Sequence, residues 1–412
     1  MVEACLSLAQ PCNPVSDDEN FNMTEPAVLQ RRSRSADAPI PFIDLAAQRD
    51  RLGDAIDRAI GRVLAHGQYI LGPEVYALEQ DLVAFSGAAE VISCASGTDA
   101  LALLLMAKGL RPGQAVLCPS FTFAATAEVV AWFGATPVFI DVLPDTFNLE
   151  AAAIAAGVEA ANKLSLEPVG LISVDLFGQP ADYEAVEAAC TANGLWLLAD
   201  AAQSFGAEYH GRKVGTFGFA TATSFFPAKP LGCYGDGGAI FTDDAELAAV
   251  LRSLRMHGQG EDRYDNVRIG MNGRMDTLQA AILIEKLKIF PDELERRERI
   301  AARYSEALAD ITIVPTVLDG CSSSWAQYTI KVDAKRRDAL ASGLKALGIP
   351  TAIYYPKPVH RQTAYAAYPC AGNGLPVSDA IAHEVVSLPM HPYLEPETQD
   401  RIVAAVHEVL GR

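Results

Sequence analysis

Residues 171–200 read LISVDLFGQPADYEAVEAACTANGLWLLAD, with short apolar runs at 171–175 and 196–200 and a helix-length segment at 181–192 between them. Two strands joined by a helix in this way usually pair in parallel. Further β-rich runs occur along the chain, at 91–94, 115–118, 137–141, 220–224 and 238–242, with another helix-length segment at 100–108. The pattern predicts a large α/β domain with a mostly parallel sheet of about seven strands, covered by helices.

The apolar spacing outside this sheet predicts further elements. Helices are expected at 56–64 and 75–85, a helix-rich stretch at 276–308, and strands at 328–332 and 351–355. We therefore predict a large domain over 39–290 and a smaller C-terminal α+β domain over 291–412. Residues 1–38 are rich in Ser, Pro, Asn, Asp and Arg and are expected to form a disordered tail. A native start at Met23, which would exclude residues 1–22, is an alternative interpretation of that tail.

The chain has 412 residues and a formal net charge of -18, from 33 Lys and Arg against 51 Asp and Glu. Such an excess of negative charge disfavours nucleic acids and anionic membrane surfaces as partners. The apolar runs are too short to span a bilayer, and the N-terminus lacks the basic start of a secretory signal. The eight cysteines form no C-x-x-C pair. We expect a cytoplasmic protein with reduced, mostly buried cysteines and no bound metal.

Three segments at predicted strand ends carry candidate chemistry, because ligands of open parallel sheets bind beyond the carboxyl ends of the strands. After the strand at 91–94, the small-residue turn Ala95-Ser96-Gly97-Thr98 opens a helix. The free N–H groups and the dipole of a helix start favour a phosphate. An ordinary strand-to-helix turn, capped by Ser96 or Thr98, would have the same sequence.

The other two segments contain Asp200 and Lys229. Asp200 ends the strand at 196–200. Three roles are open to a carboxylate at this position: a helix cap, a buried structural acid, or the partner of a protonated heterocyclic nitrogen. Lys229 lies between Pro227 and Pro230 in an apolar, glycine-rich segment. Most lysines are solvated, but desolvation in such a setting lowers the pKa of the amine and makes it a nucleophile. A phosphate-binding turn, a strand-end Asp and a rigidly placed Lys, in this order, are expected of a pyridoxal phosphate enzyme.

From about Phe42 to its end, the chain resembles the DegT/StrS family of sugar-nucleotide aminotransferases. Four motifs carry the resemblance: GQYILGPE at 67–74, SGTDAL at 96–101, DAAQS at 200–204 and SFFPAKPLGCYGDGG at 224–238. The resemblance implies the fold type I architecture of pyridoxal phosphate enzymes. It also implies a homodimer in which each subunit contributes to the active site of the other.

The resemblance further implies a role for each matching residue. Lys229 would bind the cofactor covalently and Asp200 would pair with its ring nitrogen, which makes these two the catalytic residues. The other cofactor contacts would be Gln203 at the phenolic oxygen, Phe123 stacked on the ring, and, at the phosphate, Gly97, Thr98, Ser224 and the Asn272 of the other subunit. Small neutral donors suit a phosphate held at a helix start, and an aromatic face limits the tilt of the ring.

In the reaction that the resemblance implies, glutamate gives its amino group to the cofactor and leaves as 2-oxoglutarate. A UDP-linked keto sugar then takes the amino group. The segments at 67–74, 224–238 and 387–393 are similar to the subgroup that aminates C3 of UDP-2-acetamido-2-deoxy-3-oxo-glucuronate. The product would be a 3-amino uronic acid for a surface polysaccharide such as the O antigen of lipopolysaccharide.

A uronate substrate requires a cation, because an unpaired buried carboxylate is costly. Arg274 is the candidate, and an ion pair at the dimer interface is the alternative role for this side chain. Members of the subgroup can carry His-Tyr-Pro where this chain has Tyr354-Tyr355-Pro356, so a phenol would contact the sugar or the donor carboxylate in place of an imidazole. His257 and His360 are expected to have structural hydrogen-bonding roles.

Two other functions are compatible with these motifs. A relative that aminates a 4-keto-6-deoxy sugar nucleotide would share them, whereas elimination is disfavoured because a histidine replaces the lysine in the dehydratase branch. A non-catalytic regulator with the same fold is the second alternative. The acidic chain, without an appended DNA-binding helix pair, argues against it.

Overall fold

The computed structural model describes residues 39–262 and 264–411. The predicted N-terminal tail and the alternative start at Met23 lie outside these residues. By its internal contacts, the chain from Pro39 onward forms one unit. The division of this unit into domains at 39–290 and 291–412 therefore stays a prediction.

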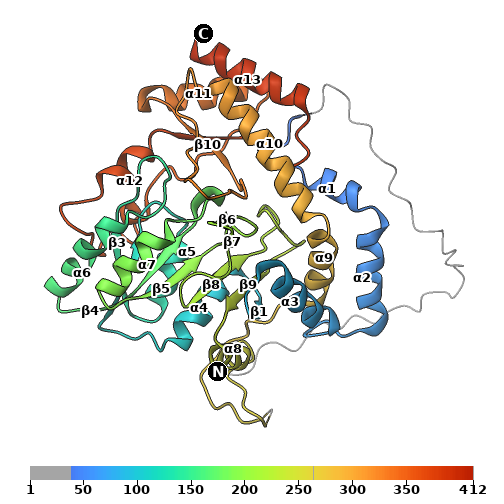
Figure 1. Ribbon diagram of the computed structural model, residues 1–412, viewed down its shortest axis with the longest axis vertical. Helices are drawn as coiled ribbons and strands as arrows, with labels where there is room; N and C mark the ends of the chain where they lie inside the picture. Colours follow the sequence, from blue (N-terminus) through green and yellow to red (C-terminus); the bar gives the residue numbers. More distant parts are fainter. Residues whose placement is uncertain (1–38, 263, 412) are drawn as a thin grey trace, which may run out of the picture. The chain divides into compact units, whose positions relative to one another are not determined.

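A seven-stranded sheet lies at the centre of this unit, with the strand order β1-β9-β8-β5-β4-β2-β3 (Figure 1). All strands run in one direction except β9, which is antiparallel to both of its neighbours. The strands are β1 (Glu90–Cys94), β2 (Gln114–Pro119), β3 (Thr136–Ile140), β4 (Glu167–Val174), β5 (Trp196–Asp200), β8 (Ala220–Ser224) and β9 (Gly238–Thr242). Each overlaps one of the seven predicted runs, so the α/β class with a mostly parallel sheet is confirmed.

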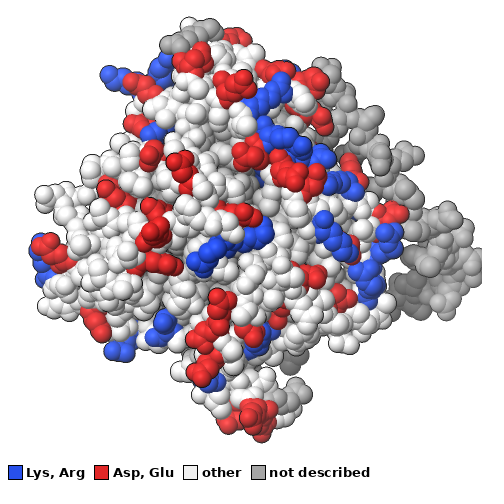
Figure 2. Space-filling model, viewed as in Figure 1, with Lys and Arg blue, Asp and Glu red and all other residues white. Residues whose placement is uncertain are grey.

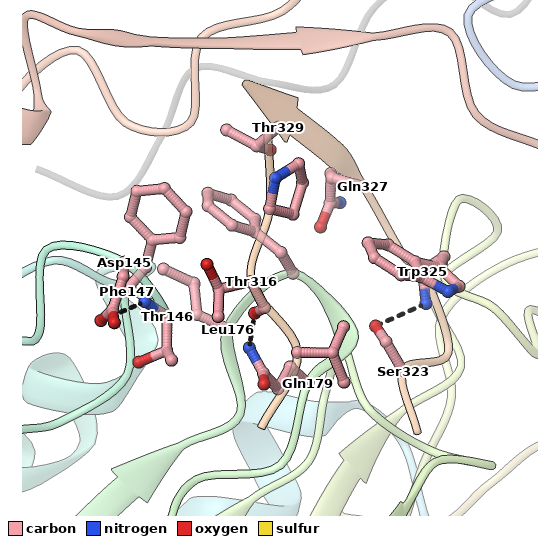
Figure 3. Close-up of a pocket in the computed structure, with 13 residues that line it drawn as sticks. Asp145, Thr146, Phe147, Leu176, Gln179, Thr316, Ser323, Trp325, Gln327 and Thr329 are labelled. Carbon is pink, nitrogen blue, oxygen red and sulfur yellow. Dashed lines mark hydrogen bonds between the residues drawn. The ribbon is translucent and has the colours of Figure 1, made fainter. Parts of the chain in front are cut away.

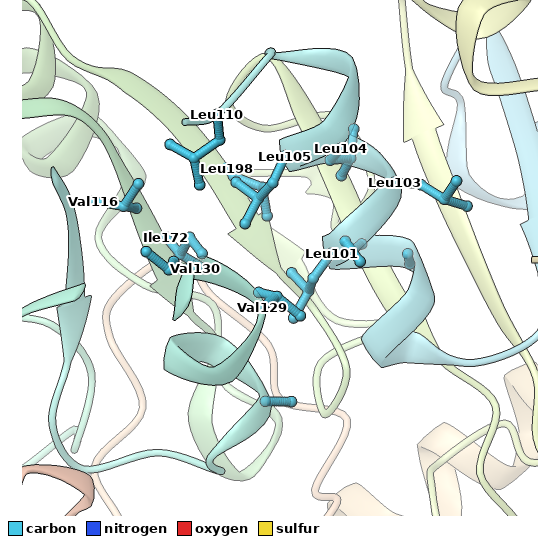
Figure 4. Packing of buried hydrophobic residues seen from close by; sticks show 14 of the residues in the cluster. Leu101, Leu103, Leu104, Leu105, Leu110, Val116, Val129, Val130, Ile172 and Leu198 are labelled. Atoms are coloured by element: carbon cyan, nitrogen blue, oxygen red, sulfur yellow. The ribbon is translucent and has the colours of Figure 1, made fainter. Parts of the chain in front are cut away.

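Helices cover both faces of the sheet, and neighbouring strand residues point to opposite faces. Ile172 and Leu198 pack with α4 (Gly97–Ala107), α5 (Ala125–Trp132) and α8 (Ala245–Leu254) (Figure 4). Leu171 and Leu197 pack on the other face with α6 (Ile154–Lys163) and α7 (Tyr183–Ala192). A sheet buried on both faces explains why its strands read as continuous apolar runs in the sequence.

Helix α4 is apolar on all sides because it is enclosed. Residues 100–105 are each no more than 2% exposed, since α4 lies between the sheet and the helices α5 and α8. Burial of each of its leucine side chains contributes roughly 2 kcal/mol of transfer free energy. The helix start that carries Gly97 and Thr98 is therefore anchored to a fully buried helix.

A second group of helices packs beside the β1 edge of the sheet: α1 (Leu45–Leu52), α2 (Asp54–His66), α3 (Pro73–Ser86), α9 (Thr277–Leu287) and α10 (Phe290–Leu308). Helices α2 and α3 confirm the predicted segments at 56–64 and 75–85, and both pack against α9. The predicted stretch at 276–308 contains two helices. Pro291 separates them, because a residue without an N–H fits the first turn of α10 but not a helix interior.

The C-terminal residues form their own hydrophobic cluster around β10, which confirms the strand predicted at 328–332. The elements of this part of the chain are β10 (Tyr328–Lys331), α11 (Ala334–Ala346), α12 (Pro376–Ile381), β11 (Val385–Leu388) and α13 (Pro396–Leu410), and α12 packs in a separate cluster through Ile381. The strand predicted at 351–355 is wrong, because β11 pairs with β10 and Ala352 forms only an isolated bridge to Ser387. Pro350 and Pro356, which have no N–H to donate, flank the segment.

Short elements complete the described chain: the hairpin of β6 (Glu208–Tyr209) and β7 (Arg212–Lys213), and the 3₁₀ turns η1 (Ala151–Ala153), η2 (Leu176–Gly178) and η3 (Val359–Arg361). No helix within 39–262 or 264–411 is long and apolar enough to cross a membrane. Basic and acidic side chains are interspersed on the face shown in Figure 2. The six cysteines in these ranges are free, and four of them are buried.

Candidate active site

The first part of the site is the start of α4, which follows β1. Ser96 caps this helix, because its hydroxyl accepts a hydrogen bond from the Asp99 N–H (3.0 Å). The N–H groups of Gly97 and Thr98 lie in the first turn, where a helix offers them no acceptor. A Cβ atom on Gly97 would lie 2.6 Å from the Cβ of Ser224, at the end of β8. The absent side chain of Gly97 thus leaves a narrow cradle beside the Ser224 hydroxyl.

Asp200 ends β5 and is buried, with 6% of its surface exposed. Its Oδ1 accepts a hydrogen bond from the Ala202 N–H (3.1 Å), and its Oδ2 accepts one from the Thr126 hydroxyl (3.2 Å). Burial raises the pKa of this carboxyl, while the Ala202 N–H, the Lys229 ammonium and the Thr126 hydroxyl act in the opposite direction. The carboxylate therefore has neutral donors and one nearby amine as its partners.

Lys229 lies in the loop between β8 and β9, and backbone hydrogen bonds hold this loop in shape. The Lys229 N–H donates to the Phe226 carbonyl (2.8 Å) and the Cys233 N–H to the Phe225 carbonyl (2.8 Å). Lys286, a fully buried residue of α9, donates from Nζ to the Gly232 carbonyl (2.6 Å). Withdrawal from water lowers the pKa of Lys229 to about 8, against the opposing effect of Asp200. Near this pH a large fraction of the amine is unprotonated and nucleophilic.

Gln203 presents a fixed end of its amide to the site. Its Oε1 accepts a hydrogen bond from the Phe177 N–H (2.7 Å), and its Nε2 lies 3.3 Å from the Tyr355 hydroxyl. The Phe123 ring is 59% exposed, and its centroid lies 6.5 Å from that of Tyr355. The structure therefore brings Gln203 and two aromatic rings together.

These residues fit pyridoxal phosphate. The cradle at Gly97 and Ser224 offers uncharged donors to a phosphate. Asp200 can hold a proton on a ring nitrogen, because a buried carboxylate favours a cationic partner. The amide hydrogens of Gln203 suit a phenolate oxygen, and the exposed Phe123 ring can cover one face of a planar ring.

The candidate residues Asn272 and Arg274 lie in a segment that contacts the residues just before α4. The Gly273 carbonyl accepts a hydrogen bond from the Ala95 N–H (3.0 Å). Asn272 is exposed, and Arg274 is partly buried with an Nε atom that has no hydrogen-bond partner among the described residues. Tyr354 packs near Phe42, with ring centroids 6.5 Å apart.

The two histidines singled out in the sequence lie in different surroundings. His360 is buried, and its Nδ1 lies 2.5 Å from the Ser120 hydroxyl, which joins η3 to the end of β2. Its Nε2 lies 3.3 Å from Asp379. His257 is exposed, and its carbonyl accepts a hydrogen bond from Asn266. The contacts of His360 agree with a structural hydrogen-bonding role.

Sequence reasoning missed Thr126 and Phe177, which contact Asp200 and Gln203 directly. Thr126 lies 74 residues from Asp200, and only the packing of α5 on the sheet brings the two together. The sole local signal was a hydroxyl residue in the first turn of the helix that follows Phe123. Phe177 contributes its backbone N–H, for which side-chain identity gives no signal.

A separate cavity of about 20 Å³ lies between the loops at 145–147 and 176–179 and the segments at 315–317 and 323–329. Figure 3 shows Asp145, Leu176, Thr316 and Gln327 around it. Its volume suffices for about one water molecule and is far too small for a cofactor. The described residues also contain no group of three or more His, Cys, Asp and Glu side chains that could hold a metal ion.

Asp175, which lies between β4 and η2, is a second buried acid beside the site. It accepts hydrogen bonds from the Ala181 N–H (2.8 Å), the Tyr183 hydroxyl (2.8 Å) and the Ser204 hydroxyl (2.7 Å). Burial nevertheless raises its pKa from 3.8 to about 7. The folded state therefore binds this proton more tightly than the unfolded state does.

This difference predicts a fall in stability as the pH rises from about 4 to about 7, because the unfolded chain releases the Asp175 proton first. The slope from this group should be on the order of 1 kcal/mol per pH unit. Thermal unfolding of the variant Asp175→Asn, measured across this range, should show a shallower decline than the wild type. If the stability of the variant falls with pH as steeply as that of the wild type, groups other than Asp175 cause the decline.

Comparisons with known proteins agree with this geometry. A family model described as the DegT/DnrJ/EryC1/StrS aminotransferase family matches residues 50–407. The UDP-2-acetamido-2-deoxy-3-oxo-D-glucuronate aminotransferase of Pseudomonas aeruginosa is 48% identical over 368 residues, which cover 89% of this chain and 99% of the relative. The pleiotropic regulatory protein of Geobacillus stearothermophilus is 41% identical over 90% of this chain and 98% of its own.

Among solved structures, a DegT DnrJ EryC1 StrS aminotransferase from Brucella abortus superimposes with a TM-score of 0.89 and 53% sequence identity. The match covers 90% of this chain and 100% of the Brucella chain. The likeness thus extends over the sheet, the loop with Lys229 and the C-terminal cluster together.

Proposed function

This chain belongs to the DegT/DnrJ/EryC1/StrS aminotransferase family, and we propose that it moves an amino group from glutamate to C3 of UDP-2-acetamido-2-deoxy-3-oxo-glucuronate. The enzyme is a sugar-nucleotide aminotransferase that uses pyridoxal phosphate. One observation of the structure supports the site assignment above all others: the loop that carries Lys229 leaves β8 at the sheet edge where the buried Asp200 ends the neighbouring strand β5, and the charges of the two side chains interact. The choice of sugar is supported by the Pseudomonas relative.

Each residue of the site has a task in this reaction. When bound, pyridoxal phosphate supplies an electron sink for the carbon atom from which a proton is removed. Lys229 would attach the cofactor through Nζ and, once released, carry the proton away from the donor carbon and return it elsewhere. Asp200 would keep the ring nitrogen protonated. Gln203 would donate to the phenolic oxygen.

The remaining cofactor contacts position the group. Gly97, Thr98 and Ser224 would bind the phosphate with backbone and hydroxyl donors, and Phe123 would cover the ring and exclude water from one face. In the second half of the reaction the same residues act in reverse order, because the keto sugar receives the amino group that glutamate gave.

For the sugar, we assign Arg274 to the uronate carboxylate and Tyr354 and Tyr355 to the substrate. The Arg274 guanidinium has a buried Nε atom without a partner among the described residues, and a carboxylate placed there would satisfy this donor. The Tyr355 hydroxyl is already near Gln203. Burial raises the pKa of Tyr355, so it stays a neutral phenol.

We also assign a homodimer, with Asn272 reaching the cofactor phosphate of the partner subunit. Support comes from the segment around it, where Tyr264 is 83% and Ile269 is 91% exposed. Exposed apolar side chains gathered on one segment are typical of a protein interface. The free cysteines agree with a reducing compartment, and we place the reaction in the cytoplasm as a step toward a surface polysaccharide.

The substrate assignment is tested by product analysis with glutamate and a panel of keto-sugar nucleotides. The panel contains the UDP-3-oxo uronate, its neutral 3-oxo counterpart and a 4-keto-6-deoxy hexose nucleotide. We expect selective formation of the 3-amino uronate. Selective turnover of the 4-keto sugar would overturn the assignment and favour the alternative aminotransferase.

In the same panel, Arg274→Gln should lower kcat/KM for the uronate by about ten- to a hundredfold, because a charged hydrogen bond is lost. The glutamate half-reaction and the neutral 3-oxo sugar should change little. Arg111→Gln, at an exposed arginine in the turn before β2, is the matched control. An equal loss with both sugars would show that Arg274 supports the fold or the dimer instead.

A regulatory role is the second candidate, because a relative of 41% identity carries the description of a pleiotropic regulatory protein. That function would need no bound cofactor and no turnover. The cofactor-dependent absorbance of the wild type and of a variant at position 229 separates the two functions.

A further inference from the structure

We propose that Thr126 is a positioning residue for catalysis: its hydroxyl fixes one oxygen of the Asp200 carboxylate, so that the carboxylate meets the cofactor ring nitrogen in one orientation. The inference rests on the proposed role of Asp200 at that nitrogen. It concerns a residue that itself would touch neither cofactor nor substrate. Its effect would pass through Asp200.

The contact is buried and specific. Thr126 is 1% exposed, and its Oγ1 donates to Oδ2 of Asp200 over 3.2 Å. The Thr122 hydroxyl lies 3.2 Å from the same Oγ1. Because Thr126 has a single hydroxyl hydrogen, which Asp200 takes, Thr122 must donate to Thr126. Two hydroxyl groups in a row thus point their hydrogens toward Asp200, and each strengthens the other in a buried setting.

The backbone holds Thr126 in place independently of this contact. Its N–H donates to the Phe123 carbonyl (3.3 Å), and its carbonyl lies 3.7 Å from the Sγ of Cys118. This hydrogen bond links Phe123, which precedes α5 and is assigned to the face of the ring, to Thr126 in the first turn of α5, which contacts Asp200. This geometry couples the stacking residue and the acid through one rigid turn.

The other oxygen of Asp200 accepts from the Ala202 N–H (3.1 Å). With one neutral donor on each oxygen, the carboxylate cannot rotate without losing a hydrogen bond. A free carboxylate in a buried site would lose this orientation. The loss of one donor would also shift the carboxyl toward its neutral form, in which it cannot stabilise a cationic ring.

Several titratable groups face Asp200 and are unchanged when only the Thr126 hydroxyl is removed. Lys229 lowers the pKa of Asp200, while burial raises it. The charge of Asp200 in turn raises the pKa values of its neighbours, which are Asp175, Cys118, Tyr183 and Tyr355. Removal of one donor to the charged form raises the pKa of Asp200. We therefore expect the acid limb of the pH profile, which is the change of the bound cofactor's absorbance on the acidic side, to shift to higher pH.

The test compares Thr126→Val, which keeps the shape, with Thr126→Ser, which keeps the hydroxyl. Three properties are measured: the dissociation constant of pyridoxal phosphate, the absorbance of the bound cofactor against pH, and the rate of the glutamate half-reaction. We expect Thr126→Val to lose about tenfold in rate and affinity and to move the acid limb up by about one pH unit. Thr126→Ser should stay within about twofold of the wild type.

Thr126→Ala supplies a second hydroxyl deletion, in case the valine variant fails to fold as judged by thermal unfolding without cofactor. A wild-type acid limb and spectrum in the folded deletion variants would overturn the inference. Asp200→Asn separates this result from a failure of the proposed site. If that variant alone alters the spectrum, Thr126 has no positioning role; if it too leaves the spectrum unchanged, the role of Asp200 fails, and with it the inference.

Discussion

Lys229→Ala is expected to abolish transamination, with a loss of at least about 10³- to 10⁴-fold, because the amine both attaches the cofactor and moves the proton. The purified wild type should show a visible absorbance band from bound pyridoxal phosphate, and the variant should lack it. Borohydride reduction of the wild type followed by peptide mapping should find the adduct on the segment at 224–238. Absence of the band in the wild type would favour the regulatory function.

Lys286 is the matched control for this experiment. Its side chain is buried, and withdrawal from water lowers its pKa to about 8, as it does for Lys229. Chemistry alone would thus allow either lysine to react. The structure distinguishes them, since Lys286 Nζ already donates to the Gly232 carbonyl and stacks on the Tyr234 ring at 4.3 Å. An adduct on Lys286, or on any other lysine, would contradict the assignment of the site.

Asp200→Asn should lower the rate of the glutamate half-reaction by about 10²- to 10³-fold, because the neutral amide no longer stabilises a positive ring nitrogen. The substitution keeps the shape of the side chain, so the fold should persist. The absorbance of the bound cofactor should change together with the rate. The measurement is a single-turnover experiment with glutamate, which leaves the sugar substrate out of the comparison.

Asp175→Asn provides the control, because Asp175 is also a buried acid and directly follows the neighbouring strand β4. Its three donors come from the protein itself. We expect that variant to change the pH dependence of stability and to leave the cofactor spectrum as it is. Equal effects of both substitutions on the spectrum would show that general disruption, and no specific contact to the ring, explains the loss.

The sheet could be predicted from the sequence because its strands are buried on both faces. Each is a short apolar run bounded by turns, and the βαβ spacing implied parallel pairing. The pairing of the two C-terminal strands, β10 and β11, was harder to predict. The segment at 351–355 has strand composition, but Val385–Leu388 pairs with β10 in its place. Which of two short apolar runs pairs with a strand depends on tertiary packing, which local sequence does not contain.

The site was predictable where its residues follow strand ends in compact motifs. Asp200, Gln203 and Lys229 belong to such motifs, and the structure places them near one another. The contacts that orient them join distant parts of the chain: Thr126 with Asp200 and Gln203 with Tyr355. No spacing rule connects residues 74 or 152 positions apart, so these contacts could be found only in the fold.

The hydrogen bond from Phe177 to the Gln203 side chain has a consequence for selectivity. With its carbonyl oxygen occupied at 2.7 Å, the amide cannot turn over without setting two N–H groups against each other. Whatever group sits in front of Gln203 therefore meets hydrogens and must supply lone pairs. The Gln203 amide can thus disfavour a molecule that presents an N–H at this point, and a backbone N–H, not a charged residue, fixes this preference.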